Sequence, residues 1–206
     1  MKIITNVFKK PVGYLLLIVM MGGCAASYTP INPEARKYRT GDSLAPVTFF
    51  YKYDVLGIQG NKRYVKKEAK NGLSVLSVKI TNNTDSVINT SSIKLYASTR
   101  QIIPMNATSA ALQLRQGTVA YLLYCLMFLT ISSNSSSYGE DQHPTIIPIG
   151  IPIGIGNMIG AGSANQNLLR EFMKYDITDR IIKPHETLYG IITLKETTHE
   201  ALRIDF

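Results

Sequence analysis

The stretch LSVLSVKITNNTD, residues 73–85, decides the expected fold, because an alternating apolar run ends there in a cluster of turn-forming residues. Alternation along much of residues 73–81 is typical of a strand with one buried face, and Asn82-Asn83-Thr84-Asp85 favours a turn. A second β-rich run, VINTSSIKLYAST, follows at residues 87–99. The two runs predict an antiparallel hairpin or a facing pair of strands in a sandwich.

Further short strands are expected at both ends of the chain. VTFFYKYDVL at residues 47–56 is rich in β-branched and aromatic residues. KPHET, residues 183–187, reads as a turn before the strand at residues 188–195, and residues 201–206 supply a last strand. The 206 residues, 45% of them hydrophobic, suffice for one buried core. We therefore expect a mainly β fold, an immunoglobulin-like antiparallel β-sandwich.

The N-terminus carries the features of a signal peptide. Three lysines precede a ten-residue apolar run at residues 12–21, which is too short to span a membrane. Residues 1–23 are therefore expected to be removed, and the mature chain to face an exported compartment. Cys24 and Cys125 are the only cysteines, and we expect Cys125, which lies in an apolar run, to be a buried, inert thiol.

The four residues Met21-Gly22-Gly23-Cys24 resemble the lipobox of bacterial lipoproteins, with Met21 where leucine is usual. This resemblance implies cleavage between Gly23 and Cys24, with diacylglycerol and an N-acyl lipid on Cys24 as the only attached groups. Ala25 and Ala26 lack the aspartate that signals inner-membrane retention in enterobacterial lipoproteins, which favours the outer membrane. The alternative is an ordinary secretory signal followed by a chance cysteine.

Two stretches, VKITNNTDSVINTSSIKLYA and IKPHETLYGIITL, are similar to parts of small β-sandwich lipoproteins of uncharacterised function in the bacterial envelope. The resemblance covers about half of the mature chain and carries no catalytic motif. It supports the fold more than a function.

The expected domain order follows from composition. Residues 24–46 are polar and contain three prolines, so they are interpreted as the lipidated N-terminus and a tether. Residues 47–206 are expected to form the sandwich domain, interrupted by a hydrophobic, partly helical insertion at about residues 107–162. Residues 163–177 have the strongest amphipathic helix signal, with Ser163 as its cap and Leu168, Leu169, Phe172 and Tyr175 or Met173 on one face.

The insertion is nearly free of charge. Residues 116–139 and 142–169 contain no Asp, Glu, Lys or Arg, and the polar loop 132–144 lies between the two apolar arms. This pattern predicts a hydrophobic hairpin over residues 117–162, with a largely disordered insertion as the alternative. Its contact residues, which meet the chain's own domain, a partner or a membrane, are expected to be Leu122, Leu123, Leu126, Phe128, Ile149, Ile151, Ile153 and Ile155.

The ribbon IPIGIPIGIG, residues 147–156, leaves two conformations open. Prolines cost about 3 kcal/mol inside a helix and glycines about 1 kcal/mol, which favours an extended segment with all its isoleucines on one face. A helix would instead align prolines and glycines every four residues and fit the G-x-x-x-G pattern of closely packed helices.

The net charge and the remaining motifs limit the classes of function that the chain can have. Removing residues 1–23 takes away three lysines, which leaves 19 basic against 14 acidic side chains and a net charge of +5. Five of the cations cluster in an expected strand-to-strand connection, as either a solvated arm or a patch for anionic lipid surfaces: Lys62, Arg63, Lys66, Lys67 and Lys70. His143, His185 and His199 fit no metal-binding spacing, and no catalytic motif is present, so we expect neither a metal nor an enzyme.

These features predict a non-enzymatic envelope lipoprotein that acts as an interaction or assembly module. Its expected partners are the membrane, through the lipid anchor, and an envelope protein, while export argues against nucleic acid. Two alternatives remain: a membrane-active protein that inserts its hairpin into a bilayer, and a surface binder of carbohydrate or another ligand. The sequence leaves the oligomeric state open.

Overall fold

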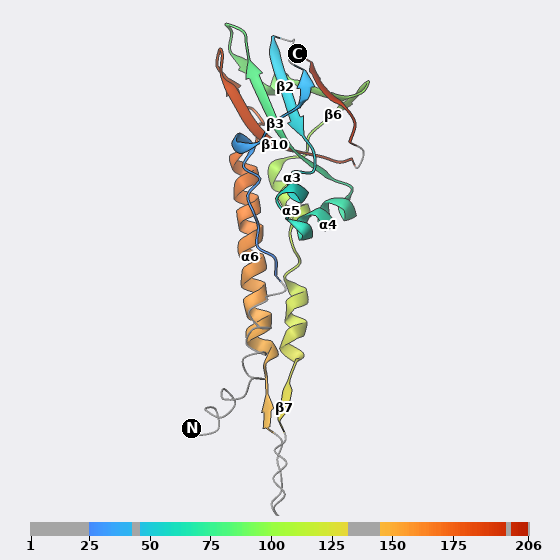
Figure 1. Cartoon of the computed structure of the whole chain (residues 1–206), viewed down its shortest axis with the longest axis vertical. Coiled ribbons are helices and arrows are strands. Elements are labelled where there is room, and N and C mark those ends of the chain that lie inside the picture. The colour runs from blue at the N-terminus through green and yellow to red at the C-terminus, as the bar shows by residue number, and fades with distance from the viewer. Residues whose placement is uncertain (1–24, 43–45, 132–144, 197–198, 206) are drawn as a thin grey trace, which may run out of the picture. The chain divides into compact units, whose positions relative to one another are not determined.

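The computed structural model of the chain describes residues 25–42, 46–131, 145–196 and 199–205 (Figure 1). The predicted signal peptide, Cys24 and the polar loop 132–144 lie outside these residues. Two compact units are present: unit 1 comprises residues 1–27 and 117–163, and unit 2 comprises residues 28–116 and 164–206. Helices make up about 38% and strands about 29% of the structure, so the fold is mixed α/β rather than mainly β.

Unit 2 contains two larger antiparallel sheets. The first has the order β1-β2-β3-β10, formed by β1 (Thr40–Asp42), β2 (Val47–Lys52), β3 (Ser74–Asn82) and β10 (Thr187–Leu194). The second has the order β11-β5-β6, formed by β5 (Lys94–Ala97), β6 (Arg100–Ile102) and β11 (Leu202–Asp205). A small sheet joins β4 (Ile88–Asn89) to β9 (Ile181–Ile182).

The two larger sheets face each other across an apolar core. The strand β2 alternates between buried and half-buried residues, and its buried side chains Val47, Phe49 and Tyr51 pack with apolar residues of β3, β10, β5, β6 and β11. Such alternation places every second side chain between the layers. The expected antiparallel sheets are therefore present, as parts of a mixed α/β fold.

The pairing within these layers differs from one expectation. Residues 73–81 do not form a hairpin with residues 87–99: β3 pairs with β2 and β10, while β5 pairs with β6 and β11. In an immunoglobulin domain the second and third strands lie in different sheets, whereas β2 and β3 are neighbours here. The helices between β2 and β3 allow this arrangement, because they return the chain to the same sheet.

Helices form the second core of unit 2, at one end of the first sheet (Figure 1). They are α3 (Val55–Ile58), α4 (Lys62–Asn71), α5 (Ala107–Leu114) and residues 164–174 of α6 (Gly150–Lys174), with the short 3-10 turns η1 (Pro33–Ala35) and η2 (Thr90–Ser92) elsewhere in the unit. The side chains of Leu168, Phe172 and Tyr175 are buried, as the amphipathic pattern predicted, whereas Met173 is exposed. The helix does not begin at Ser163, which lies in its interior.

The segment expected to be a tether is mostly part of unit 2. Tyr28 and Ile31 are buried in the helical core, and Tyr28 packs edge-on against the ring of Tyr64. Farther along, residues 40–42 form the edge strand β1. Two apolar side chains in a polar stretch give no hydrophobic period, which explains why composition alone indicated a linker.

Unit 1 contains a hairpin of two arms. The first arm is the 3-10 helix η3 (Val119–Leu126) followed by β7 (Leu129–Ile131), and the second is β8 (Thr145–Ile147) followed by residues 150–163 of α6. The strands β7 and β8 pair antiparallel, and the amide of Gly150 donates to the carbonyl oxygen of Met127 at 3.0 Å. Figure 1 shows η3 beside the first turns of α6. The predicted hydrophobic, partly helical hairpin is therefore present.

The ribbon IPIGIPIGIG is not extended beyond Ile147, because α6 begins at Gly150. The argument from proline was wrong for a specific reason: Pro152 is the third residue of the helix, where the backbone amide has no partner within the helix anyway. Two of the glycines have a packing role. A Cβ atom on Gly150 would lie 1.5 Å from the carbonyl oxygen of Tyr124, and one on Gly154 would lie 2.8 Å from that of Tyr121.

Candidate functional site

The main candidate site is an exposed apolar surface on unit 1. On α6, three isoleucines four residues apart form a stripe, and their exposed fractions rise from 44% at Ile151 to 49% at Ile155 and 68% at Ile159. On the first arm, Leu123 and Leu126 are about 70% exposed. We call the following set the apolar face of unit 1: Val119, Leu122, Leu123, Leu126, Met127, Phe128, Ile146, Ile151, Ile155 and Ile159.

The predicted contact residues divide between this face and the interior of the hairpin. Six of them, Leu122, Leu123, Leu126, Phe128, Ile151 and Ile155, are exposed, whereas Ile149 and Ile153 are half-buried. Sequence reasoning missed Ile159, because it followed the ribbon as a strand and stopped where the alternation stops. Helical spacing from Ile151 and Ile155 would have found it.

No charged residue lies on the described arms of the hairpin, at residues 117–131 and 145–163. Contiguous apolar surface without charge is uncommon on a monomeric protein and marks a contact with a protein or a membrane. Cys125 lies on the first arm of the hairpin. Its thiol was expected to be buried but is half-buried, and Gly154 of α6 lies next to it.

The tip of the hairpin adds unpaired backbone to this surface. Among the described residues, β7 and β8 pair only with each other, so each strand keeps one open edge. Open edges are sites for strand addition by another chain. Lipid-exposed open edges do not occur in the hydrocarbon core of a bilayer, because nothing there satisfies the backbone groups.

Unit 1 also holds the residue that follows the predicted lipidation site. The amide of Ala25 donates to Asn157 Oδ1 on α6 at 2.9 Å, and its methyl group lies beside Gly160. Cys24 itself lies outside the described residues. The side chain of Asn157 is buried, so this hydrogen bond gives its amide oxygen a partner.

The predicted cationic cluster lies on a helix rather than in a strand-to-strand arm. All five cations belong to α4, and its spacing places Lys62, Lys66 and Lys70 on one exposed stripe while Tyr64 is buried on the opposite face. The first turn of α4 contains no acidic residue. The chain ends the helix with Gly72 in the left-handed conformation at φ 63°, where glycine is favoured. The cluster therefore forms one basic helix surface.

Two carboxyl groups of unit 2, the buried Glu171 and the half-buried Glu68, serve the fold. Glu171 accepts hydrogen bonds from the hydroxyl of Tyr28 and from the amides of Ile31 and Asn32, the latter two at 3.0 and 2.8 Å. This clamp fixes the start of the unit to α6. Glu68 accepts from the amide of Val75 at 2.6 Å, and burial raises its pKa to about 7.

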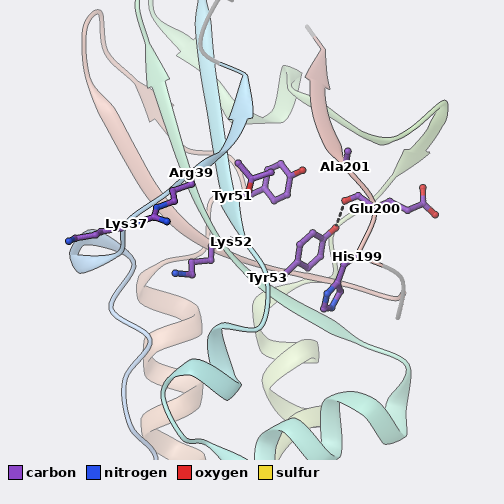
Figure 2. Close-up of a pocket in the computed structure, with 9 residues that line it drawn as sticks. Lys37, Arg39, Tyr51, Lys52, Tyr53, His199, Glu200 and Ala201 are labelled. Atoms are coloured by element: carbon purple, nitrogen blue, oxygen red, sulfur yellow. Dashed lines mark hydrogen bonds between the residues drawn. The ribbon is translucent and has the colours of Figure 1, made fainter.

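A pocket of about 700 Å³ lies in unit 2 between the β1–β2 edge and the residues that lead into β11 (Figure 2). Its walls include the cations Lys37, Arg39 and Lys52 and the rings of Tyr51, Tyr53 and His199. No local motif indicated this group, because its members come from the expected tether, one strand and a distant connection. A second pocket, of about 410 Å³ and lined largely by apolar side chains, lies between the two sheets.

The described residues contain no group of three His, Cys, Asp or Glu side chains placed to hold a metal ion. Of the three histidines, His185 and His199 lie near single carboxylates, Asp85 at 3.2 Å and Asp54 at 3.7 Å. His143 lies outside the described residues.

No described helix combines the length and the apolar character needed to cross a bilayer. Comparisons of the chain with protein-family models, with curated proteins and with solved structures find no match.

Proposed function

We propose that this chain is a non-enzymatic lipoprotein of the bacterial envelope, acylated at Cys24, that serves as an interaction or assembly module at the outer membrane. The apolar face of unit 1 is the surface that meets an envelope protein partner. The observation that carries this proposal is that face: large apolar side chains without charge, exposed on both arms of one hairpin.

The open edges of β7 and β8 favour a protein over a bilayer as the occupant. A partner chain satisfies these backbone groups by adding a strand, whereas lipid tails leave them without hydrogen bonds. Unit 2 then serves as a folded platform. Its four-stranded and three-stranded layers support an immunoglobulin-like architecture, with a strand order of its own.

Site-specific photocrosslinking in the cell envelope tests the proposal. A photoreactive residue at Leu123 or Ile155 is expected to give one protein adduct of defined mass. Ile155→Ser combined with Ile159→Ser should abolish the adduct formed at Leu123. The matched control is Ile58→Ser on α3, because Ile58 is also 49% exposed but lies in unit 2. Absence of any adduct, or equal loss in the control, refutes the proposal.

A second candidate function is membrane insertion of the hairpin, and the hydrogen bond between Ala25 and Asn157 favours it. That contact puts the residue after Cys24 in the same unit as the apolar face, so lipid on Cys24 and the exposed isoleucines would share one unit. Adducts with phospholipid instead of protein at Leu123 and Ile155 would establish this candidate in place of the first.

Processing at Cys24 is tested separately. Cys24→Ser should abolish incorporation of labelled palmitate and leave the precursor uncleaved, because the lipobox resemblance assigns both events to that thiol. Palmitate labelling that persists in Cys24→Ser would contradict the assignment.

A further inference from the structure

The helix α4 turns all of its cations to one side. At 3.6 residues per turn, these cations fall within an arc of about 140° around the helix axis: Lys62, Arg63, Lys66, Lys67 and Lys70. Tyr64 is buried on the other side, and Val65 packs against the helical core of unit 2. The fold therefore uses the apolar side of α4, and the charged side is left for a partner.

The charge of this surface is not balanced within the helix. In the described ranges of the chain, the side chains of the four lysines of α4 have no hydrogen-bond or ion-pair partner. The one acidic residue of the helix, Glu68, accepts a hydrogen bond from the amide of Val75 on β3 at 2.6 Å. Burial raises the pKa of Glu68 to about 7, so it carries only part of a negative charge at neutral pH. The lysines are therefore available to an anionic partner.

The start of α4 is bonded to the segment that follows the predicted lipidation site. Asn61, the residue before the helix, donates its side-chain amide to the carbonyl oxygen of Thr29 at 2.7 Å and accepts from the amide of Thr29 at 2.9 Å. The ring of Tyr64 packs edge-on against that of Tyr28, with centroids 5.4 Å apart. Tyr28 and Thr29 follow Cys24 by only four and five residues. A lipid on Cys24 would therefore keep the first turn of α4 close to a membrane surface.

The residue types on α4 suit a lipid surface better than a folded protein. Four of its five cations are lysines, whose ammonium group is a point charge on a flexible stem. Arginine, with its planar fork, is the residue that fits carboxylates held in a fixed geometry. Lipid headgroups move laterally and can gather beneath mobile lysines. Each lysine near an anionic leaflet contributes about fivefold to the binding equilibrium.

We propose that α4 is a second membrane contact of this protein, whose lysines dock on anionic lipid headgroups of the leaflet that holds the lipid on Cys24. The inference rests on the proposed acylation, which keeps the helix near that leaflet. The contact is electrostatic, because the apolar side of α4 is packed within unit 2. Salt should therefore release the helix while the acyl chains stay in the bilayer.

Acetylation of lysines by a water-soluble amine reagent, followed by mass spectrometry, tests this inference. The full-length protein is transferred from detergent onto vesicles of phosphatidylcholine alone or with about 30% phosphatidylglycerol. Labelling of Lys62, Lys66 and Lys70 should be at least about fivefold slower on the anionic vesicles, because each ammonium group must leave the phosphates to react. Salt at about 1 M should restore the labelling rate.

Lys183 is an exposed lysine of unit 2 that serves as the internal control. Its carbonyl oxygen accepts from the side-chain amide of Asn82, the last residue of β3, whereas α4 leads into the first residue of that strand. The two ends of β3 are about 27 Å apart, at about 3.4 Å for each step along the strand. Labelling of Lys183 should therefore differ by less than about twofold between the two kinds of vesicle. Equal labelling of the α4 lysines on both, or equal slowing at Lys183, would overturn the inference.

A pair of double variants assigns the contact to α4. Lys66→Gln with Lys70→Gln keeps good helix formers and should weaken docking by roughly 25-fold. The salt concentration that restores labelling of Lys62 should then fall by at least about twofold. Lys94→Gln with Lys183→Gln removes the same charge from exposed positions outside α4 and should leave that concentration unchanged. An equal fall in both variants, or none in the first, would refute the assigned surface. Circular dichroism spectra that match the parent protein establish that each variant is folded.

Failure of the lipid anchor is distinguishable from failure of this contact. Incorporation of labelled palmitate measures the anchor, and slower acetylation of the α4 lysines measures the contact. Palmitate incorporation together with equal acetylation on both kinds of vesicle would keep the proposed acylation and refute the contact. Absence of palmitate would refute the acylation and, with it, the inference.

Discussion

Replacing Gly154 by alanine tests whether the two arms of unit 1 touch as closely as described. The new Cβ atom would lie 2.8 Å from the carbonyl oxygen of Tyr121, which is 0.6 Å short of the 3.4 Å at which ordinary contact begins. It would also lie 3.1 Å from Cys125 Sγ. The nearest atom belongs to the backbone, so η3 has to move away as a segment. Overpacking of this kind costs about 1–3 kcal/mol.

Gly156 supplies the matched control, two residues farther along the same helix. A Cβ atom there meets nothing within 4 Å. Both substitutions gain the helix propensity of alanine over glycine, about 1 kcal/mol, so that gain cancels in the comparison. The expected difference in local stability is therefore the overpacking cost alone, about 2 kcal/mol, which corresponds to roughly 30-fold in an opening equilibrium.

Hydrogen exchange measured by mass spectrometry on residues 119–126 and 157–163 reads out this difference. Gly154→Ala should expose both segments to faster exchange, and Gly156→Ala should slow exchange of the helix. Equal protection in the two variants would refute the close contact between the arms. Slower exchange in Gly154→Ala would also refute it, because a free position would gain from alanine.

The remaining predictions concern unit 2. The folded pKa of Glu68 lies near 7, above the ordinary 4.5, so the folded state holds this proton more tightly and stability should fall as pH rises from about 4.5 to 7. In Glu68→Gln this fall in the free energy of unfolding should be smaller by about 2 kcal/mol, after allowance for the partial solvent exposure of Glu68. Urea unfolding at pH 5 and pH 8 measures the fall, and an equal fall in the variant and the parent protein would contradict the prediction. Glu171→Gln replaces one accepting carboxylate oxygen with an NH2 group that faces the donors of residues 28, 31 and 32. It should lower the free energy of unfolding by about 2–4 kcal/mol, whereas the exposed control Arg170→Gln should change it little. Gly190→Ala should lower the Tm by several degrees, because its Cβ atom would meet Ile177 Cγ2 at 2.0 Å, and an unchanged Tm in thermal unfolding would be evidence against that packing.

Much of unit 2 follows from local sequence. β-rich composition, alternation and turn formers located β2, β3 and β10, although only β2 alternates between buried and half-buried residues along its whole length, whereas β3 and β10 each contain five consecutive buried residues. The spacing of Leu168, Phe172 and Tyr175 located the second half of α6, because these side chains lie on its buried face. Strand order was not predictable in this way, because alternation defines which face is buried but not which strand lies alongside.

The first half of α6 shows where propensity misleads. Pro152 and the glycines lower the helix propensity of the ribbon, yet Pro152 lies in the first turn and Gly150 and Gly154 admit the backbone of η3. The benefit of these residues comes from a contact between segments about 30 positions apart, which no propensity scale includes. The pocket escaped detection for a similar reason, since it joins residues 37–53 to residues 199–201.

The Glu171 clamp has a consequence for how the proposed lipoprotein would stand on its membrane. Tyr28 is bound by Glu171, so only four peptide steps separate Cys24 from unit 2, a reach of about 14 Å at full extension. The first basic residue after Cys24 is Arg36, and its Nε donates to the carbonyl oxygen of Ile31 at 2.7 Å. Trypsin would thus find no site between a lipid on Cys24 and the start of unit 2. With the lipid proposed at Cys24, unit 2 would begin within that reach of the acyl chains.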